Sequence, residues 1–402
     1  GGGRLDLPAA ATTPRLVIDD RPASLRRDLW LAADRAYLGA IPRLSLKQAE
    51  IAARRDEERP PDWTPEPPKV HVDARAPALV DAAALVALAL ELSRVPRAAQ
   101  GLRVARASAR SEQGTLFLAD TDGMRIAQPD GYSVLVLELE ALRPDGVPVR
   151  DRLSWVAAST EELPPLAELT HEVNVAVTAL LARRAAPLLG AYEGPVVFEG
   201  EAAADLFRYL LPRELEGTPA PLEAGRSTAA QERSQPRIGR RILPPRWSVV
   251  DDPDGAPAGQ AGPTPLDREG VAAQRTLLVD DGYVVDLLMS RVPRSDRSGS
   301  TGHARGGLGG APEARMSWWE VRPGRGLARG AFARQVARAR KAARLPAVLV
   351  VQRLSPGWTG DLPETSLAVL RHADGREGSV VSLEWEGVDR RTLRAIAAAG
   401  AI

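Results

Sequence analysis

Six residues between positions 247 and 307 have side chains that could bind or react, and they lie in two turns and one glycine-rich loop. They are Asp251, Asp252, Asp267, Glu269, His303 and Arg305. Paired carboxylates can act as acid and base, but Asp before Pro and Glu before Gly are more typical of turns and caps. His303 stands in a Thr-Gly-His-Ala-Arg-Gly loop, where a peptide or a partner can approach the backbone closely. We therefore assign these residues to peptide or partner binding, and none to catalysis.

Metal and nucleophilic chemistry lack their usual residues in this chain. The absence of cysteine removes thiolate ligands and a cysteine nucleophile. The four histidines, His71, His171, His303 and His372, are far apart, and no His-Glu-x-x-His or His-Glu-x-x-x-His spacing occurs. The glycines at 306–310 lack the strand, the helix and the Lys-Ser/Thr pair of a phosphate-binding loop. The sequence predicts no metal site of its own.

Composition narrows the class of protein. The 402 residues, 44% of them hydrophobic, suit two domains, each with its own core. A net charge of +1 provides no long-range attraction to nucleic acid or anionic lipid. No apolar run approaches the length needed to span a bilayer, so we expect neither a nucleic-acid partner nor a membrane partner. Because the sequence begins at Gly1 rather than at methionine, we expect a fragment or a processed form.

Residues 1–189 are predicted to form an N-terminal α+β domain. Helices are expected from Arg21 to Gly39 and from Ser45 to about Arg55, with a break at Pro42. A proline-rich spacer and an apolar helix from Leu79 to Val95 follow. These helices precede a region in which the apolar period changes to two.

That region, after Gly101, predicts an antiparallel meander. Four clusters of turn residues separate its expected strands. They are Glu112-Gln-Gly, Asp120-Thr-Asp-Gly123, Pro129-Asp-Gly and Pro144-Asp-Gly. A helix from Thr160 to about Leu188 completes the N-terminal domain.

Residues 190–402 are predicted to form the C-terminal domain, rich in strands and hairpins. A strand at 195–198 and a helix at 201–211 are followed by a hairpin from Val271 to Arg291 that turns at Asp280-Asp-Gly282. Surface loops are expected at 218–235 and 254–265. The remaining predicted elements are a basic helix at 331–345, a strand at 347–354, a hairpin across Asp374-Gly375 and a final helix at 389–399.

Several of these segments together resemble the TldD/PmbA family, the metalloproteases also called modulators of DNA gyrase. The similar segments occur in the family's order. They are Gly194-Pro-Val-Val-Phe-Glu-Gly-Glu-Ala-Ala-Ala-Asp-Leu-Phe207, Val250-Asp-Asp-Pro253, Leu266-Asp-Arg-Glu-Gly-Val271, Arg275-Thr-Leu-Leu-Val-Asp-Asp-Gly282 and Thr301-Gly-His-Ala-Arg305. The N-terminal domain is similar more loosely, through residues 25–47 and the strand and turn at 116–123. The resemblance covers most of residues 16–400, and it implies a mixed α+β first domain and a second domain dominated by long antiparallel strands.

Catalytic members of this family carry a zinc-binding His-Glu-x-x-x-His helix, and partner members lack it and complete a heterodimer around a peptide channel. In this chain Ala204, Asp205 and Tyr209 stand approximately where the motif would be, and the family's additional cysteine ligand is missing. The resemblance therefore implies a PmbA/TldE-like, non-catalytic subunit of a cytoplasmic, bacterial peptide-processing complex. It places zinc in a TldD-like catalytic partner and makes unfolded peptide the substrate.

Two other functions are left open by the sequence. One is a peptide-binding homodimeric pseudoenzyme that holds extended peptides by strand addition. The other is an autonomous hydrolase that uses Asp267, Glu269 and His303. The sequence does not identify the peptide, or decide whether the partner is a TldD-like chain or a second copy.

Overall fold

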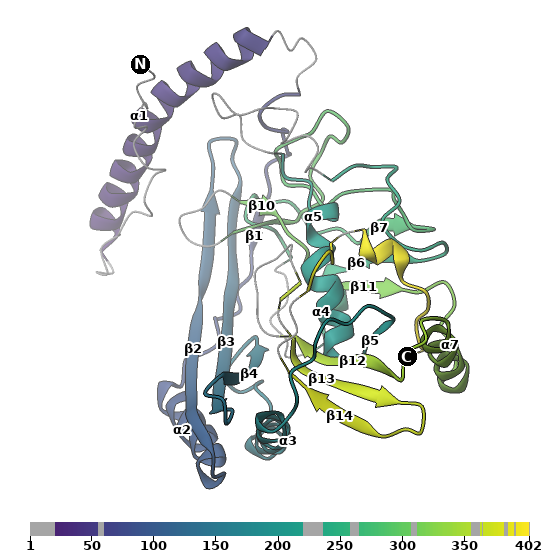
Figure 1. Ribbon diagram of the computed structural model, residues 1–402. Helices are drawn as coiled ribbons and strands as arrows, with labels where there is room; N and C mark the ends of the chain where they lie inside the picture. Colours follow the sequence, from purple (N-terminus) through teal and green to yellow (C-terminus); the bar gives the residue numbers. More distant parts are fainter. Residues whose placement is uncertain are drawn as a thin grey trace, which may run out of the picture.

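The computed structural model describes residues 21–54, 60–219, 236–257, 265–306, 312–354, 362–363, 365–381, 385–389 and 391–401. They form an α+β fold with several antiparallel sheets (Figure 1), which confirms the predicted class. Within these ranges no helix is both long enough and apolar enough to cross a membrane. The loops expected at 218–235 and 254–265, and the glycines at 307–310, fall largely outside the described residues.

The first helix, α1, runs unbroken from Pro22 to Arg54, so the predicted break at Pro42 is wrong. A proline inside a helix removes one hydrogen bond and costs about 3 kcal/mol. The helix is 33 residues long and rich in Ala, Leu and Arg, which favour helix on both sides of the proline. The hydroxyl of Ser45 also donates to the carbonyl of Ile41 at 3.3 Å. Figure 1 shows α1 standing apart from the sheets.

The longest strands, β2 (Leu102–Ala119) and β3 (Arg125–Leu142), form one hairpin of 18 residues on each side. Its turn lies at the predicted Asp120-Thr-Asp-Gly123. There the Asp120 carboxylate accepts from the backbone N–H groups of Asp122 and Met124, and Gly123 has a φ of +100°. The N-terminal half of the chain therefore contains the longest strands of the fold.

Two of the predicted turns in this hairpin are wrong, because Glu112-Gln-Gly and Pro129-Asp-Gly lie inside β2 and β3 and face each other. The other side of β3 pairs with β1 (Val70–Val72) at residues 125–127 and with β4 (Pro148–Ala157) at 133–142. Pro129, which cannot donate a ladder hydrogen bond, lies in the gap between these two partners. Glycine fits at position 131 because a Cβ there would lie 2.7 Å from the backbone carbonyl oxygen of Glu112.

Two helices cover the sheet formed by these strands. α2 (Ala82–Arg94) begins at Asp81, whose carboxylate accepts from the Ala84 N–H at 2.9 Å. α3 (Leu166–Arg184) begins after Pro165, later than predicted from Thr160. Leucine and valine side chains from both helices and from β3 and β4 form one hydrophobic core.

Shorter strands build two further four-stranded sheets in the C-terminal half. One is antiparallel, in the order β11 (Trp319–Arg322), β6 (Ser248–Asp251), β7 (Thr276–Asp280) and β8 (Tyr283–Val284). The other has the order β14 (Glu377–Val380), β13 (Thr365–His372), β12 (Ala347–Leu354) and β5 (Val196–Phe198), with β5 parallel to β12. A two-stranded sheet pairs β9 (Ala304–Arg305) with β10 (Glu313–Ala314).

A second hydrophobic core joins these sheets to the helices α4 (Glu201–Leu210) and α5 (Pro212–Leu215). The basic helix α7 (Arg329–Ala342) contacts β12. The predicted final helix at 389–399 is wrong over its described residues, which contain only a 3-10 turn at Thr392–Ala395. Backbone bonds between Leu327 and residues 399 and 401 hold that end of the chain extended instead.

The tip of the β2–β3 hairpin packs on the turn at 266–271. Met124 and Ile126 form a small buried cluster with Leu266, and the Gln128 side chain donates to the Leu266 carbonyl at 2.9 Å. Farther along the sheet, Asp151 of β4 pairs with Arg353 of β12 at 2.8 Å. The hairpin thus presses against the loops that carry the candidate site residues.

Candidate functional site

Asp267 is the centre of the turn that carries two of the candidates. One carboxylate oxygen accepts from the N–H groups of Glu269 and Val271, both at 2.9 Å, and the other accepts from the N–H of Ala304 at 2.9 Å. The side chain is fully buried. Asp267 therefore fixes the turn at 266–271 and attaches it to β9, as the turn interpretation predicts.

Gly270 completes this turn for two reasons. Its φ of +78° suits glycine, and a Cβ at this position would clash with the side chain of Met124. The turn and the tip of the hairpin therefore depend on each other.

His303 and Asp251 form a buried pair across 52 residues of sequence. The Nε2 of His303 donates to the Asp251 carboxylate at 2.9 Å, and Nδ1 lies 2.8 Å from the carbonyl of Thr301. Asp251 also accepts from the N–H of Ser317 at 2.8 Å and from its hydroxyl. Both members of the pair are fully buried. The imidazole therefore links the loop at 301–305 to the end of β6, and the ring is not exposed to solvent.

Glu269 is the most perturbed carboxyl of the site. It is 5% exposed, and one oxygen accepts from the Arg291 N–H at 2.6 Å while the other is buried without a hydrogen-bond partner. Burial raises its pKa to about 7, the Arg291 bond opposes that shift, and the nearby Asp267 charge adds to it. A carboxyl with such a pKa can exchange a proton near neutral pH.

The segment at 60–64 contacts Arg291, the residue whose backbone N–H binds the Glu269 carboxylate. The N–H of Thr64 donates to the Arg291 carbonyl at 2.8 Å, and Arg291 Nε donates back to the Thr64 carbonyl at 3.0 Å. The Arg291 guanidinium carbon also lies 4.5 Å from the centre of the Trp63 ring. The proline-rich spacer is thereby fastened to the C-terminal half beside Glu269.

Arg305 is the cation of the site. Its pKa is lowered by burial, while Asp267 and Asp251 favour its charged form. The Nη2 atom is buried without a hydrogen-bond partner, and Nη1 reaches only the neighbouring Ala304 carbonyl at 3.4 Å. The adjacent Arg268 differs, because it pairs with Asp130 of the hairpin at 2.7 Å. Arg305 thus retains donor capacity for a carboxylate or carbonyl ligand.

Asp252 is not part of this group. Its carboxylate pairs with Arg275 at 3.1 Å on the surface, and its N–H bonds to the Trp318 carbonyl. The structure therefore brings five of the six predicted residues into one region and places Asp252 apart from them. Because Asp267 and His303 are buried and fully engaged, the geometry weighs against their use as nucleophile and base in an autonomous hydrolase.

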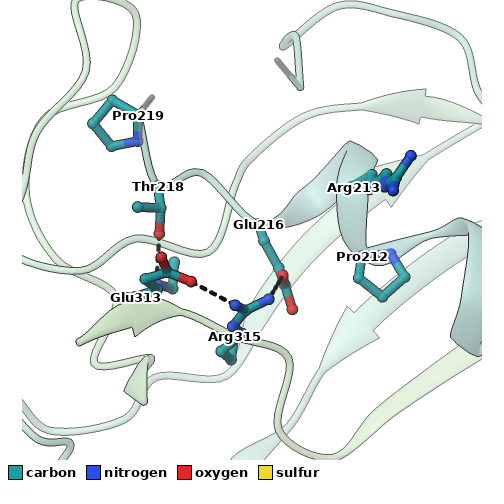
Figure 2. A pocket seen from close by; sticks show the side chains of 8 residues that line it. Pro212, Arg213, Glu216, Thr218, Pro219, Glu313 and Arg315 are labelled. Carbon is teal, nitrogen blue, oxygen red and sulfur yellow. Dashed lines mark hydrogen bonds and ion pairs between the residues drawn. The ribbon is translucent and has the colours of Figure 1, made fainter. Parts of the chain in front are cut away.

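A hollow that sequence reasoning missed lies between α5 and β10 (Figure 2). It has a volume of about 270 Å³. Arg315 binds both Glu216 and Glu313 at its edge, and the Thr218 hydroxyl accepts from the Ala314 N–H at 2.7 Å. Burial raises the pKa of Glu216. No motif pointed to this site, because Glu216 and Arg315 are brought together only by the fold.

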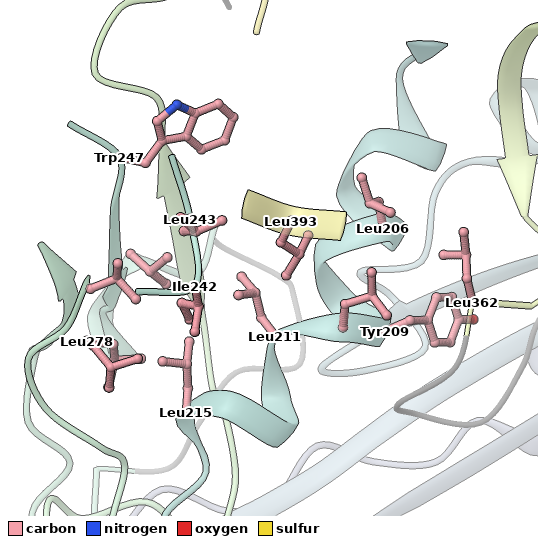
Figure 3. Packing of buried hydrophobic residues seen from close by; sticks show 14 of the residues in the cluster. Leu206, Tyr209, Leu211, Leu215, Ile242, Leu243, Trp247, Leu278, Leu362 and Leu393 are labelled. Carbon is pink, nitrogen blue, oxygen red and sulfur yellow. The ribbon is translucent and has the colours of Figure 1, made fainter. Parts of the chain in front are cut away.

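The helix expected to correspond to the zinc motif is α4. The side chain of Ala204 has no atom that could bind a metal. Asp205 is buried and its carboxylate lies 3.6 Å from the Arg208 guanidinium; burial raises the pKa of Asp205. Tyr209 is 3% exposed and belongs to the hydrophobic core, where Figure 3 shows it among Leu206, Leu211 and Leu362. These residues do not fit a zinc site. Across the described part of the chain, no group of three or more His, Asp or Glu side chains is arranged to hold a metal ion.

Solved structures of other proteins share this fold. A Thermotoga maritima protein described as a modulator of DNA gyrase aligns with a TM-score of 0.58 and 12% identity, over 86% of this chain and 76% of that one. TldE from Thermococcus kodakarensis aligns with a TM-score of 0.58 and 17% identity, over 90% and 76%. A protein from Bacteroides thetaiotaomicron, described as a modulator of DNA gyrase, aligns with a TM-score of 0.52 and 10% identity, over 80% of this chain and 67% of that one.

A family model matches part of the C-terminal half of the chain. Among curated proteins no sequence match was found. Residues 191–338 match the PmbA/TldA metallopeptidase C-terminal domain, and this range contains α4, the turn at 266–271 and the loop at 301–305. The resemblance of these segments to the TldD/PmbA family is confirmed, because residues 191–338 match that family's C-terminal domain.

Proposed function

We propose that this chain is a non-catalytic, TldE-like subunit that pairs with a zinc-bearing TldD-like chain in a cytoplasmic complex that cleaves unfolded peptides. Its family domain and its likeness to the TldE fold support the assignment. In this assignment the zinc and the general base of hydrolysis belong to the partner. The contribution of this chain is to shape the path of the peptide.

The observation that carries the proposal is the surface of α4. A catalytic zinc needs three protein ligands with nitrogen, oxygen or sulfur donors on one open face. At the expected positions α4 offers a methyl group, a buried carboxyl beside an arginine, and a tyrosine ring packed in the core. The helix is retained as a packing element, while its ligands are replaced.

The predicted binding residues have two roles: some hold the loops in place and form a frame, and one is left to contact the peptide. Asp251, Asp267 and His303 use their polar atoms to hold the loops together, so they form the frame. Arg305 has a buried Nη2 without a hydrogen-bond partner, so it is the member of this group with donor capacity left for a peptide carbonyl or carboxylate. We assign peptide contact to Arg305, and loop positioning to the three frame residues.

The test mixes the purified chain with the zinc-bearing family member encoded in the same genome. We expect the two chains to co-elute and to cleave a denatured, labelled protein, whereas this chain with zinc alone does not cleave it. The Arg305→Ala variant should co-elute but raise the KM for peptide. Arg268→Ala is the matched control, because this neighbouring arginine is already paired with Asp130.

Two results would refute the proposal. One is the absence of both co-elution and any change in peptidase activity on mixing. The other is zinc-dependent cleavage by this chain alone, which would show that a metal site is assembled elsewhere in it. An unchanged KM for Arg305→Ala, with normal co-elution, would refute the assignment of Arg305 and leave the subunit role standing.

A further inference from the structure

Residues 60–64, which we call the strap, are held against the C-terminal half of the chain by Arg291. The N–H of Thr64 donates to the Arg291 carbonyl at 2.8 Å, and Arg291 Nε donates to the Thr64 carbonyl at 3.0 Å. The guanidinium carbon also lies 4.5 Å from the centre of the Trp63 ring. Two of these three contacts use the Arg291 side chain, so its position decides how firmly the strap is held.

The strap in turn holds the helix α1. Asp62 of the strap pairs with Lys47 of the helix at 2.9 Å. None of the described side chains of α1 is buried, and Figure 1 shows the helix standing apart from the sheets. Because a helix without buried contacts is not fixed by packing, the placement of α1 depends on the strap and on Arg291.

Glu269 binds the same arginine and has one carboxylate oxygen without a partner. Its first oxygen accepts from the Arg291 N–H at 2.6 Å, and the second is buried without a hydrogen bond. A buried charge of this kind is costly unless a cation pairs with it. The charge of the Arg291 guanidinium already acts on this carboxyl. The guanidinium therefore has two alternative sites, the strap and the carboxylate.

We propose that Glu269 and Arg291 form a latch that holds the strap while the carboxyl carries its proton and releases the strap when the carboxyl ionises. With the proton bound, the guanidinium stays on Trp63 and Thr64. Once Glu269 is charged, the guanidinium turns to it, because a hydrogen bond between two charged groups is stronger than one to a neutral carbonyl. The Trp63 ring, which is 45% exposed, offers only a weak competing contact. This inference goes beyond the proposed subunit role and does not depend on it.

The proton of Glu269 is exchanged near neutral pH. Burial raises the pKa of Glu269 to about 7, so the ionised fraction rises from about 10% at pH 6 to about 90% at pH 8. The nearby Asp267 has the same sign of charge, so it favours the protonated form and offers no competing cation. The other charged groups of the surrounding turn, loops, hairpin and strap act elsewhere. They are Arg268 with Asp130, His303 with Asp251, Arg294 with Asp296, Asp62 with Lys47, and Arg305, which is influenced by Asp267 and Asp251.

A spin label on the strap measures the latch directly. The chain has no cysteine, so Pro61→Cys, at an exposed position of the strap, gives a single labelling site. The label should be immobile at pH 6 and mobile at pH 8, with a midpoint near pH 7 and a mobile fraction that rises several-fold. Val175→Cys, at an exposed position of α3, is the matched control, and its label should have the same mobility at both pH values.

Two variants of the strap-labelled chain test the two members of the latch separately. Glu269→Gln cannot ionise and keeps an acceptor for the Arg291 N–H, so its strap should stay immobile at both pH values. Arg291→Met removes both side-chain contacts with the strap, so its strap should be mobile at both pH values. Glu161→Gln, at an exposed position, should behave as the labelled chain without a second substitution.

Equal mobility of the strap label at pH 6 and pH 8, with no second substitution, would overturn the latch. So would a pH-dependent strap in Glu269→Gln or in Arg291→Met, because the latch needs both side chains. Release of the strap as the pH falls would also contradict it, since the bound proton is expected to keep the strap in place. Each of these outcomes leaves the proposed subunit role standing.

Discussion

Replacing Glu269 by glutamine is expected to stabilise the protein above pH 7 and to flatten the pH dependence of its stability. Glu269 is 5% exposed, and its second carboxylate oxygen has no hydrogen-bond partner. Burial raises its pKa from 4.5 to about 7, and Asp267 adds to the shift. The folded protein therefore holds the Glu269 proton more tightly than the unfolded chain does.

The sign and size of the effect follow from this difference. Because the folded pKa lies above the unfolded one, the stabilisation by the bound proton is complete below pH 4.5 and is lost as the pH rises to about 7. A pKa difference of about 2.5 between the folded and unfolded protein changes the free energy of unfolding by about 3 kcal/mol. Glutamine keeps an acceptor for the Arg291 N–H. Its amide nitrogen takes the place of the oxygen that has no partner, and this buried, unpaired donor lowers the free energy of unfolding by about 1 kcal/mol. The net gain at pH 8 is about 2 kcal/mol.

Urea unfolding of both proteins between pH 4 and pH 8 measures this gain. The wild-type free energy of unfolding should fall across the range relative to that of Glu269→Gln, and the two curves should cross in the acidic half. Glu161→Gln, at a solvent-exposed position, is the control and should follow the wild type. Parallel curves for wild type and Glu269→Gln, or a variant that is less stable at every pH, would refute the assignment of a buried, perturbed carboxyl.

Three further substitutions test how the halves of the chain are held together. Arg353→Met leaves Asp151 buried without its 2.8 Å partner and should lower the free energy of unfolding by about 3 kcal/mol in urea titrations; a loss below about 1 kcal/mol would contradict this. Gly270→Ala, at a φ of +78° and against a packed side chain, should lower the melting temperature clearly, whereas Gly378→Ala, in open space, should not. His303→Ala should destabilise by about 3 kcal/mol, because it leaves a buried carboxylate without its partner, and a variant of wild-type stability would show that the pair is not structural.

Local residue patterns were sufficient to predict much of the secondary structure. The strand at 347–354 and the turns at 120–123, 280–282 and 374–375 occur where predicted, because Asp-Gly pairs and alternating apolar residues act over a few positions. The interrupted helix at Pro42 and the turn at Pro129 were wrong for a common reason. Proline and glycine mark a break only where no partner strand or flanking helix offsets the lost hydrogen bond.

In the candidate site too, local turns were predicted from the sequence, whereas contacts between distant residues were not. The turn character of Asp267 and Gly270 was predicted from their neighbours in sequence, and it is confirmed by the bonds that Asp267 accepts. The pairing of His303 with Asp251 joins residues 52 positions apart, and no spacing rule connects them. The separation of Asp252 from the group was equally invisible in the sequence.

The sequence by itself predicted the resemblance to the TldD/PmbA family and the α+β class, because these depend on residue identity and local order. Only the tertiary structure decided which polar groups are buried, which are satisfied and which keep free donors. Those properties depend on the elements that pack around each side chain. For that reason Glu269 acquires a raised pKa and Arg305 an unbonded donor, although neither residue is exceptional in the sequence.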